Sequence, residues 1–241
     1  MSDTFIVRGG RPLEGDTEAR GSKNAASKMM IASLLTEEPC IIENIPLSGE
    51  IDITLELCRM IGSRVELDPE HRCSIHTPRV ENSRVVELTR RNRIPILAIG
   101  PLLHRTGVAE VPTMGGDKIG HRPIDFHIAA LRQMGVTVEL RDHSYYAVSQ
   151  EIHGAEIKLP YPSVGATENI ILAAVLANGT TIIHNAAVEP EIMNLIRMLQ
   201  SMGAEIKSKN TERFIEIRGV KNLHGTTAIV MPDRNEIVSF A

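Results

Sequence analysis

The segment Met134-Gly-Val-Thr-Val-Glu-Leu140 occurs in two further versions along the chain, and this repetition decides the fold. The other versions are Ile61-Gly-Ser-Arg-Val-Glu-Leu67 and Met202-Gly-Ala-Glu-Ile-Lys207. In each version, apolar residues at helical spacing precede the glycine, and a short run typical of a strand follows it. A glycine at this place is typical of the left-handed residue that ends a helix. The three glycines lie 73 and 68 residues apart, so the sequence predicts a unit of about 70 residues that occurs three times.

Each predicted unit starts with a helix whose residues are apolar on nearly all sides. These three helices are expected at residues 25–35, 96–103 and 170–177. A helix without a polar face is typically buried on every side, whereas strands of alternating polarity fit sheets with one face in water. The pattern predicts an α/β fold with buried helices and outer sheets about a pseudo-threefold axis. Periodicity alone fits a generic α/β layer fold equally well.

The composition excludes several classes of protein. The 241 residues are 42% hydrophobic and carry a net charge of −4, which fits one or two folded domains and not a disordered chain. The longest apolar runs, residues 94–103 and 170–177, are shorter than the roughly 20 residues that cross a bilayer. The N-terminus lacks the pattern of a signal peptide, and three cysteines are too few and too irregular for a disulfide framework or a zinc site. We therefore expect a cytoplasmic protein without a membrane partner, and the acidic balance argues against a nucleic-acid partner.

A fourth, partial copy of the unit spans the two ends of the chain. Residues 5–17 match residues 214–227 nearly position for position. The first segment is followed by Gly21-Ser-Lys-Asn24 and a buried helix, and the second by Pro232-Asp-Arg-Asn235 and an apolar run that reaches residue 241. On the logic of the repeat, we expect the chain to enter a further unit without completing it.

Three segments at the starts of the buried helices are the first candidates for chemistry. They are Gly21-Ser-Lys-Asn-Ala25, Arg91-Asn-Arg-Ile-Pro95 and Ser163-Val-Gly-Ala-Thr-Glu-Asn169. The repeat would bring these helix N-termini to one end of the molecule, where free backbone N–H groups and partial positive charge bind anions. Lys23 and Arg93 lie there at equivalent positions. This equivalence favours an anion site over the alternative of two solvated charges at helix ends.

The segment from Met114 to His127 is the second candidate. Its glycines allow the backbone to approach a ligand closely, and Pro123 suits the first position of a helix. Arg122 would then hold an anion together with backbone amides at a helix N-terminus, and an ordinary flexible turn is the alternative. His121 and His127 lack the spacing of metal ligands, and the common nucleotide, hydrolase and metalloprotease motifs are missing, so we expect neither a metal nor a cofactor. From the residues alone, the prediction is a site for a small molecule with several negative charges.

Seven motifs spread over the whole chain are shared with one known family. They are Leu13-x-Gly, Gly21-Ser-Lys-Asn-Ala-Ala26, Arg93 with Ala98-Ile-Gly-Pro-Leu102, Gly115-Gly-x-x-Ile-Gly-x-Arg-Pro-x-Asp-x-His127, Ser163-Val-Gly-Ala-Thr167, Glu189-Pro-Glu-Ile192 and Pro232-Asp-Arg234. Together they resemble the UDP-N-acetylglucosamine enolpyruvyl transferase (1-carboxyvinyltransferase) family. The related shikimate-pathway enolpyruvyl transferases are the weaker match, because their lysine segment differs.

The resemblance implies an inside-out α/β barrel built from βαβαββ-type repeats, with two domains of three repeats each in a family member. Carried over, residues 22–229 form a complete three-repeat domain. Residues 1–21 and 230–241 are then fragments of a second domain that is otherwise missing. On this reading the chain is truncated and lacks the C-terminal half of the active site.

The resemblance also implies an activity, the transfer of the enolpyruvyl group of phosphoenolpyruvate to the 3′-hydroxyl of UDP-N-acetylglucosamine in peptidoglycan synthesis. Lys23, Arg93 and Arg122 would hold the phosphate and the carboxylate. The implied substrate-binding residues are Lys23, Asn24, Arg93, Arg122, Pro123, Ile124, Asp125, Phe126, Tyr161, Pro162, Ser163 and Val164. Asp117 stands where many family members have a cysteine, and a carboxyl group with a raised pKa can also donate a proton. Asp117, Lys23 and Arg122 are therefore the implied catalytic residues.

The first hypothesis is the N-terminal part of an enolpyruvyl transferase that is active only with the rest of the polypeptide, and two alternatives to it stay open. One is a non-catalytic remnant that keeps its affinity for a nucleotide sugar. The other is a chain that becomes active with a separately encoded C-terminal half as its partner. Release of phosphate from the two substrates by this chain alone would separate the alternatives.

Overall fold

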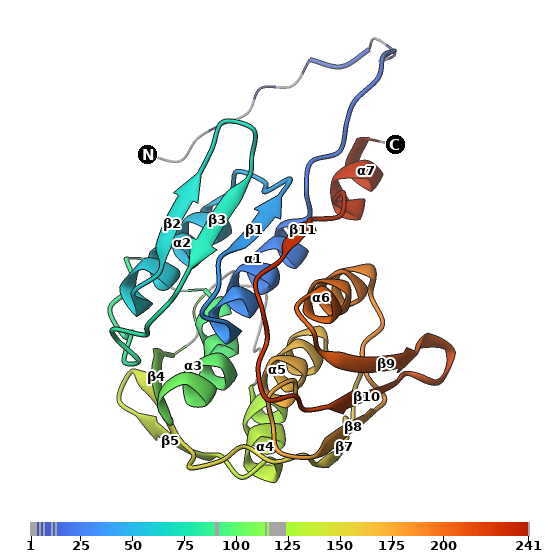
Figure 1. The fold of residues 1–241 in the computed structure, drawn as a ribbon. Coiled ribbons are helices and arrows are strands. Elements are labelled where there is room, and N and C mark those ends of the chain that lie inside the picture. Colours follow the sequence, from blue (N-terminus) through green and yellow to red (C-terminus); the bar gives the residue numbers. More distant parts are fainter. Residues whose placement is uncertain are drawn as a thin grey trace.

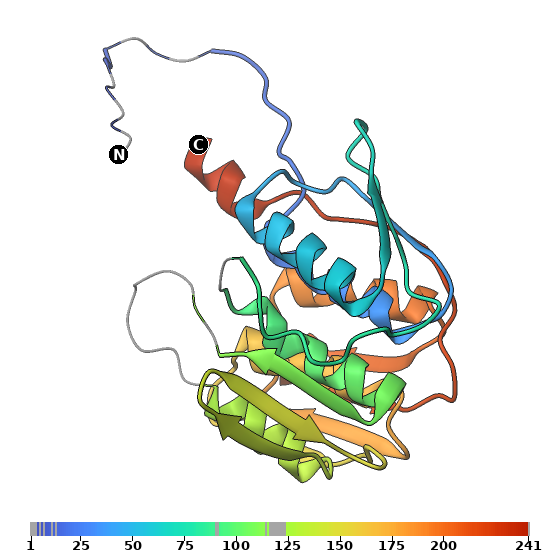
Figure 2. The same cartoon turned by 90° about the vertical axis from the view of Figure 1, so that its left-hand side faces the viewer.

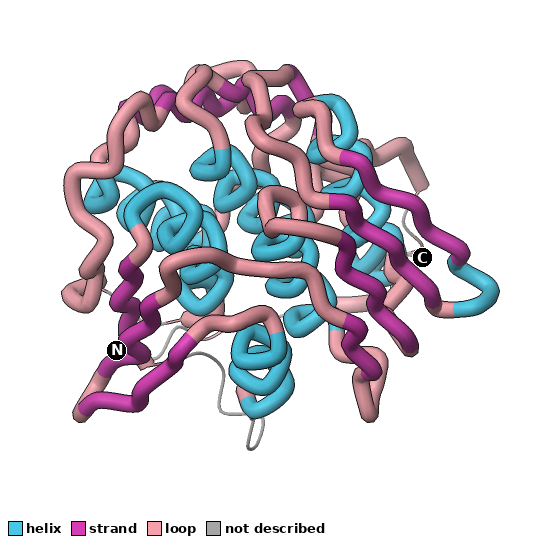
Figure 3. The backbone as a smooth tube through the Cα atoms, turned by 60° about the horizontal axis from the view of Figure 1, so that its bottom comes forward, coloured by secondary structure: helices cyan, strands magenta, loops and turns pink. Residues whose placement is uncertain are grey.

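Helices fill the centre of the molecule and sheets surround them (Figure 1, Figure 3). The structure, a computed structural model, describes residues 4, 6, 8–10, 12, 14–89, 92–113, 115 and 124–240. Its inner helices are α1 (Lys23–Ala32), α3 (Ile99–Thr106) and α5 (Val164–Ala174). The 3-10 helices η1 (Ser33–Leu35) and η2 (Ile94–Ala98) adjoin α1 and α3. The prediction that the apolar helices are buried in the centre is confirmed.

The third inner helix differs from the prediction in its position along the chain. The apolar pattern predicts residues 170–177, whereas α5 begins at Val164 and ends at Ala174. Thr167, Glu168 and Asn169 lie in this helix and are at most 1% exposed. Because these buried residues are polar, a search for an apolar run misses the first half of the helix.

A second set of helices contacts both the inner helices and the strands. These outer helices are α2 (Gly49–Ile61), α4 (Asp125–Gln133) and α6 (Pro190–Ser201). The glycines that follow them have left-handed backbone angles, with φ of 112° at Gly62, 85° at Gly135 and 101° at Gly203. Such angles are strained for residues with a side chain. The prediction that these glycines end the helices is confirmed.

Each sheet combines a strand that follows an inner helix with a hairpin that follows an outer helix. The orders are β11-β1-β3-β2, β4-β6-β5 and β7-β8-β10-β9. The bounds are β1 Cys40–Glu43, β2 Arg64–Leu67, β3 Cys73–His76, β4 Val108–Pro112, β5 Thr137–Arg141, β6 Ser144–Val148, β7 Glu156–Lys158, β8 Thr180–His184, β9 Glu205–Lys209, β10 Phe214–Arg218 and β11 Thr227–Ile229. The hairpin strands pair in antiparallel register, as in β5 and β6, where Leu140 lies opposite Tyr145.

Parallel pairing joins each unit to the next one. Strand β11 pairs with β1, and β7 pairs with β8. The third link is a parallel bridge between Arg84 and Glu110, beside which the Val85 N–H donates to the Glu110 carbonyl oxygen at 2.8 Å. The units therefore repeat their connections as well as their helices, which confirms the predicted α/β fold with three repeats. In the described residues the three sheets remain separate. The division into residues 22–229 and two terminal fragments stays a prediction.

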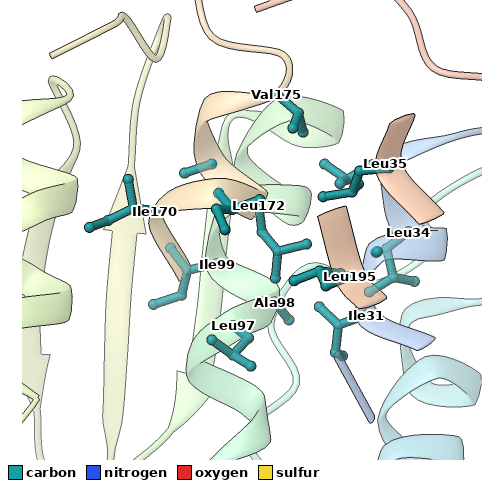
Figure 4. Close-up of a cluster of buried hydrophobic side chains, with 14 of the residues drawn as sticks. Ile31, Leu34, Leu35, Leu97, Ala98, Ile99, Ile170, Leu172, Val175 and Leu195 are labelled. Atoms are coloured by element: carbon teal, nitrogen blue, oxygen red, sulfur yellow. The ribbon is translucent and has the colours of Figure 1, made fainter. Parts of the chain in front are cut away.

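A single apolar core joins the three units. Figure 4 shows Ile31, Leu97, Ile170 and Leu195 among the side chains that meet there from α1, η2, α5 and α6. Each of these four side chains is at most 2% exposed. Removing such side chains from water is the main favourable contribution to folding, at roughly 2 kcal/mol for each one that is fully buried.

The two ends of the described chain lie at one end of the molecule (Figure 2). The short helix α7 (Arg234–Phe240) contacts the N-terminal segment there, since the Arg20 N–H donates to Glu236 Oε2 at 2.8 Å. Gly21 forms an antiparallel bridge with Pro232. Over the described residues, no helix combines the length and apolar character that a membrane span requires.

Candidate functional site

The first turns of several helices line one cavity of about 570 Å³. Lys23 and Asn24 come from the start of α1, Arg93 directly precedes η2, and Val164 starts α5. The helices α2, α4, α6 and α7 also contribute residues from their first turns. Because each helix N-terminus carries partial positive charge, their convergence favours an anionic ligand. Lys23 and Arg93, which the repeat places at one end of the molecule, both line this cavity.

Local hydrogen bonds fix the starts of these helices. The Ser163 Oγ accepts from the Ala166 N–H at 3.3 Å, which caps α5. The Asn92 Oδ1 accepts from the Ile94 N–H at 3.0 Å, one residue from Arg93. These caps place Arg93 and Val164 at the cavity wall.

Four acidic residues also line the cavity, and this acidic part of the site was not predicted from the sequence. Glu50 starts α2, Glu189 and Glu191 start α6, and Glu168 lies in the second turn of α5. The Lys28 Nζ lies 3.7 Å from Glu50 Oε1. Positive and negative side chains therefore line the cavity together.

Arg234, the first residue of α7, contacts one of these acidic residues. Its Nε donates to Glu191 Oε1 at 2.9 Å. Glu191 is 3% exposed, and its second carboxylate oxygen is buried without a hydrogen-bond partner among the described residues. A ligand with hydroxyl or amide donors could supply that partner.

Glu168 is the most perturbed carboxyl group of the cavity. It is 1% exposed. Burial raises its pKa to about 7, opposed by the charge of Lys28 and assisted by the charges of Glu50, Glu191 and Glu189. A carboxyl group with such a pKa is partly protonated at neutral pH.

His127 faces the same cavity from the first turn of α4. It is 3% exposed, and its Nδ1 has no hydrogen-bond partner in the described part of the chain. Burial lowers its pKa to about 4, and the charge of Arg93 lowers it further against the opposing charge of Asp125. The ring packs against Gly165, where an added Cβ would come within 3.2 Å of its Cε1. His127 is therefore neutral at physiological pH and can accept or donate one hydrogen bond.

Other residues expected at the site lie outside this cavity or outside the described chain. The described candidates that do not line the cavity are Ile124, Asp125, Phe126, Tyr161, Pro162 and Ser163. Phe126 packs against the apolar core, whereas Tyr161 is 65% exposed. Asp117, Arg122 and Pro123 lie outside the described residues. Their predicted roles are untested by the structure.

The residues missed from the sequence left recognisable signals. Lys28 is a charged residue in the second turn of α1, and Glu168 is a charged residue in the second turn of α5. Charged residues are almost never buried unless they have a partner. Lys28 lies within the helix predicted at residues 25–35, so it could have been predicted to face a partner or a cavity, whereas Glu168 lies before the helix predicted at residues 170–177. No group of three or more histidine, cysteine, aspartate or glutamate side chains among the described residues is arranged to hold a metal ion.

Comparison with known proteins identifies the family. The sequence family of EPSP synthase (3-phosphoshikimate 1-carboxyvinyltransferase) matches residues 7–241. The chain belongs to this family. The resemblance to enolpyruvyl transferases that the motifs predict is therefore confirmed.

Curated relatives of this chain are named as enzymes with one activity. The chain is 46% identical to the UDP-N-acetylglucosamine 1-carboxyvinyltransferase of Chlamydia abortus, covering 97% of this chain and 53% of that protein. It is 43% identical to the protein of that name from Protochlamydia amoebophila, covering 99% of this chain and 53% of that protein. The chain thus spans about half the length of the curated relatives it matches.

Solved structures of enolpyruvyl transferases share the fold. The enolpyruvyl transferase NikO of Streptomyces tendae matches with a TM-score of 0.82 and 22% identity, over 96% of this chain and 55% of that one. The EPSP synthase of Acinetobacter baumannii matches with a TM-score of 0.73 and 19% identity, over 94% and 52% of the two chains. The arrangement of inner helices and outer sheets is therefore that of the enolpyruvyl transferases.

Proposed function

We propose that this chain supplies one side of the active site of a UDP-N-acetylglucosamine 1-carboxyvinyltransferase. The observation that carries the proposal is the cavity in which Lys23 and Arg93 meet at converging helix N-termini. The curated relatives support the choice of substrates over the shikimate-pathway alternative, since those reported above carry the UDP-N-acetylglucosamine name. The reaction serves peptidoglycan synthesis in the cytoplasm and requires no cofactor.

In the proposed reaction, the residues of this chain bind anions and supply a proton. Lys23, Arg93 and Arg122 hold the phosphate and the carboxylate of phosphoenolpyruvate, where paired cations and helix N-termini stabilise them. Asp117 donates a proton to the enol carbon, and the adjacent carbon then accepts the 3′-hydroxyl oxygen of the sugar, whose hydroxyl proton passes to a base. Loss of a proton and of phosphate from the tetrahedral intermediate completes the transfer. Asn24 and the segments 122–126 and 161–164 line the nucleotide-sugar site.

Replacement of Lys23 tests the anion site. We expect Lys23→Gln to weaken binding of inorganic phosphate to the purified chain by about tenfold or more, because a charge-assisted hydrogen bond is lost. Isothermal titration calorimetry measures the affinity. Lys207→Gln is the matched control, since Lys207 is 83% exposed on β9. Equal phosphate affinity in the Lys23 variant and in the wild type would refute the proposed site.

Turnover distinguishes the enzyme from a binding module. Phosphate release from phosphoenolpyruvate and UDP-N-acetylglucosamine by this chain supports an enzyme that is active by itself. Release that requires an added C-terminal half of a relative supports a two-part site. Binding of the nucleotide sugar without release under either condition would identify a non-catalytic binding module.

The role of Asp117 predicts resistance to epoxides of the fosfomycin type, which alkylate thiols. The cysteines at positions 40, 58 and 73 are buried, and burial raises the pKa of Cys58 to about 12 and that of Cys73 to about 11. Thiols of this kind are unreactive because the thiolate is the nucleophile. We expect no adduct on the wild type and a single adduct on Asp117→Cys, measured by mass spectrometry. Rapid stoichiometric alkylation of the wild type between residues 114 and 127 would contradict the assignment.

A further inference from the structure

Lys28 and Glu168 are charged residues of two inner helices, and neither has a role in the proposed reaction. Lys28 lies in the second turn of α1, and its side chain is 12% exposed. Glu168 lies in the second turn of α5 and is 1% exposed. Both side chains line the cavity that contains Lys23 and Arg93. Two nearly buried charges at an anion site affect the anion directly, because the low dielectric of the interior strengthens their interaction with it.

Three further carboxyl groups line the cavity together with Glu168. Glu50, Glu189 and Glu191 line the same cavity as Glu168. Lys28 interacts with Glu50 at 3.7 Å. The Ser27 Oγ lies 2.9 Å both from Glu50 Oε1 and from the Lys23 carbonyl oxygen.

A second cation of the cavity is paired with another of these carboxylates. Arg234 donates to Glu191 at 2.9 Å. Lys28, which lies 3.7 Å from Glu50, also acts on Glu168 through its charge. Carboxyl groups that share one cation in a buried space cannot all ionise without a cost in free energy.

We infer that Glu168 determines the affinity of the cavity for anions by taking up a proton from solvent when an anion binds at Lys23 and Arg93, with Lys28 as its buried counter-ion. The proton moves from water or buffer onto a carboxylate oxygen of Glu168 and removes the charge that repels the anion. This inference rests on the anion site of the proposed function and names the residue that tunes it.

The acid–base properties of the neighbouring groups agree with this role. The pKa of Glu168 is about 7 without a ligand, and burial is the largest cause of this value. About half of the Glu168 carboxyl groups are therefore protonated near pH 7 before an anion binds. His127 also lines the cavity, but its pKa of about 4 leaves it neutral over the same range. A bound anion raises the pKa of a carboxyl group further. Anion binding and proton uptake are therefore coupled between about pH 6 and pH 8.

The test measures sulfate binding to the complete chain as a function of pH. Sulfate keeps its two negative charges throughout this range, so the ligand itself does not titrate. We expect the wild type to bind sulfate on the order of tenfold more tightly at about pH 6 than at about pH 8. Calorimetry near pH 7 in two buffers of different ionisation enthalpy is expected to show net uptake of a fraction of a proton.

Three variants assign the effect to Glu168. Glu168→Gln is expected to lose both the pH dependence and the proton uptake. Lys28→Met is expected to move the pH dependence to higher pH, because the cation that lowers the pKa of Glu168 is removed. Glu66→Gln is the matched control, since Glu66 is exposed on β2 and is expected to behave as the wild type.

The protonation of Glu168 on sulfate binding can also be measured on the wild type alone. Carbon-13 labelling of the glutamate carboxyl groups reports their titration by NMR, and sulfate is expected to raise the midpoint of one carboxyl group that titrates near pH 7. Sulfate affinity that does not change with pH, or a wild-type pH dependence in Glu168→Gln, would overturn this inference alone. Lack of sulfate binding at every pH would overturn the anion site and the inference with it.

Discussion

Replacing Arg105 by methionine is expected to lower the free energy of unfolding by about 3–5 kcal/mol. The Arg105 side chain is 11% exposed. Its Nη1 donates to the carbonyl oxygens of Leu34 at 3.1 Å and Thr36 at 2.9 Å. Its Nη2 donates to the carbonyl oxygens of Thr77 at 2.9 Å and Pro78 at 3.3 Å. Methionine would fill much of the same space and satisfy none of these acceptors.

The effect is large because the four acceptors lie at places that secondary structure leaves unpaired. Leu34 and Thr36 stand at the end of η1, and Thr77 directly follows β3. All three residues are at most 2% exposed, so water cannot readily replace the guanidinium. Arg105 belongs to α3, in the second unit of the repeat, whereas its acceptors belong to the first unit. The side chain therefore joins two units as well as completing their hydrogen bonds.

Urea unfolding measures the change, and two further variants interpret it. Arg197→Met removes an exposed arginine from α6 and is expected to change stability by less than about 0.5 kcal/mol. Arg105→Lys is expected to recover only part of the loss, because one ammonium group cannot match the geometry of a guanidinium. An Arg105→Met variant within about 1 kcal/mol of the wild type would show that the four carbonyl groups find other partners.

The fold could be predicted from sequence because its repeats carry strong local signals. The apolar character of α1 and α3 and the glycines after the outer helices follow from local rules of burial and backbone geometry. The boundaries of α5 could not be predicted in the same way. Thr167, Glu168 and Asn169 are buried by the helices around them, and no local pattern shows that polar residues will be buried.

The cationic part of the site could be predicted and the acidic part could not. Lys23 and Arg93 occupy equivalent places in the repeat, so symmetry alone brings them together. Glu168 and Arg234 come from different units, and only the packing of α5, α6 and α7 places them at one cavity. Glu189 belongs to a motif that the family resemblance identifies, but that motif gives no position in space.

Replacing Glu168 by glutamine is expected to raise the free energy of unfolding by roughly 2–3 kcal/mol at about pH 8 and to change it little at about pH 5. The folded-state pKa of about 7 lies above the ordinary value of 4.5. The folded protein therefore holds a proton that the unfolded chain releases between these two values. Wild-type stability falls as pH rises through this interval and is constant above it with respect to this group. Glutamine has nearly the same shape without the charge, so its variant avoids this loss.

Urea unfolding of both proteins across the pH range tests this expectation. His127 acts in the opposite direction, since its folded-state pKa of about 4 lies below the ordinary 6.5 and stability is lost as pH falls between them. Both proteins contain His127, so its contribution cancels in the difference between them. Glu66→Gln, which removes an exposed carboxylate, is expected to show no comparable gain at about pH 8. The substitution removes both the attraction between Lys28 and the Glu168 carboxylate and the cost of burying that carboxylate. A Glu168→Gln variant that is less stable than the wild type at about pH 8 would contradict the expectation, because it would show that the attraction is the larger of the two.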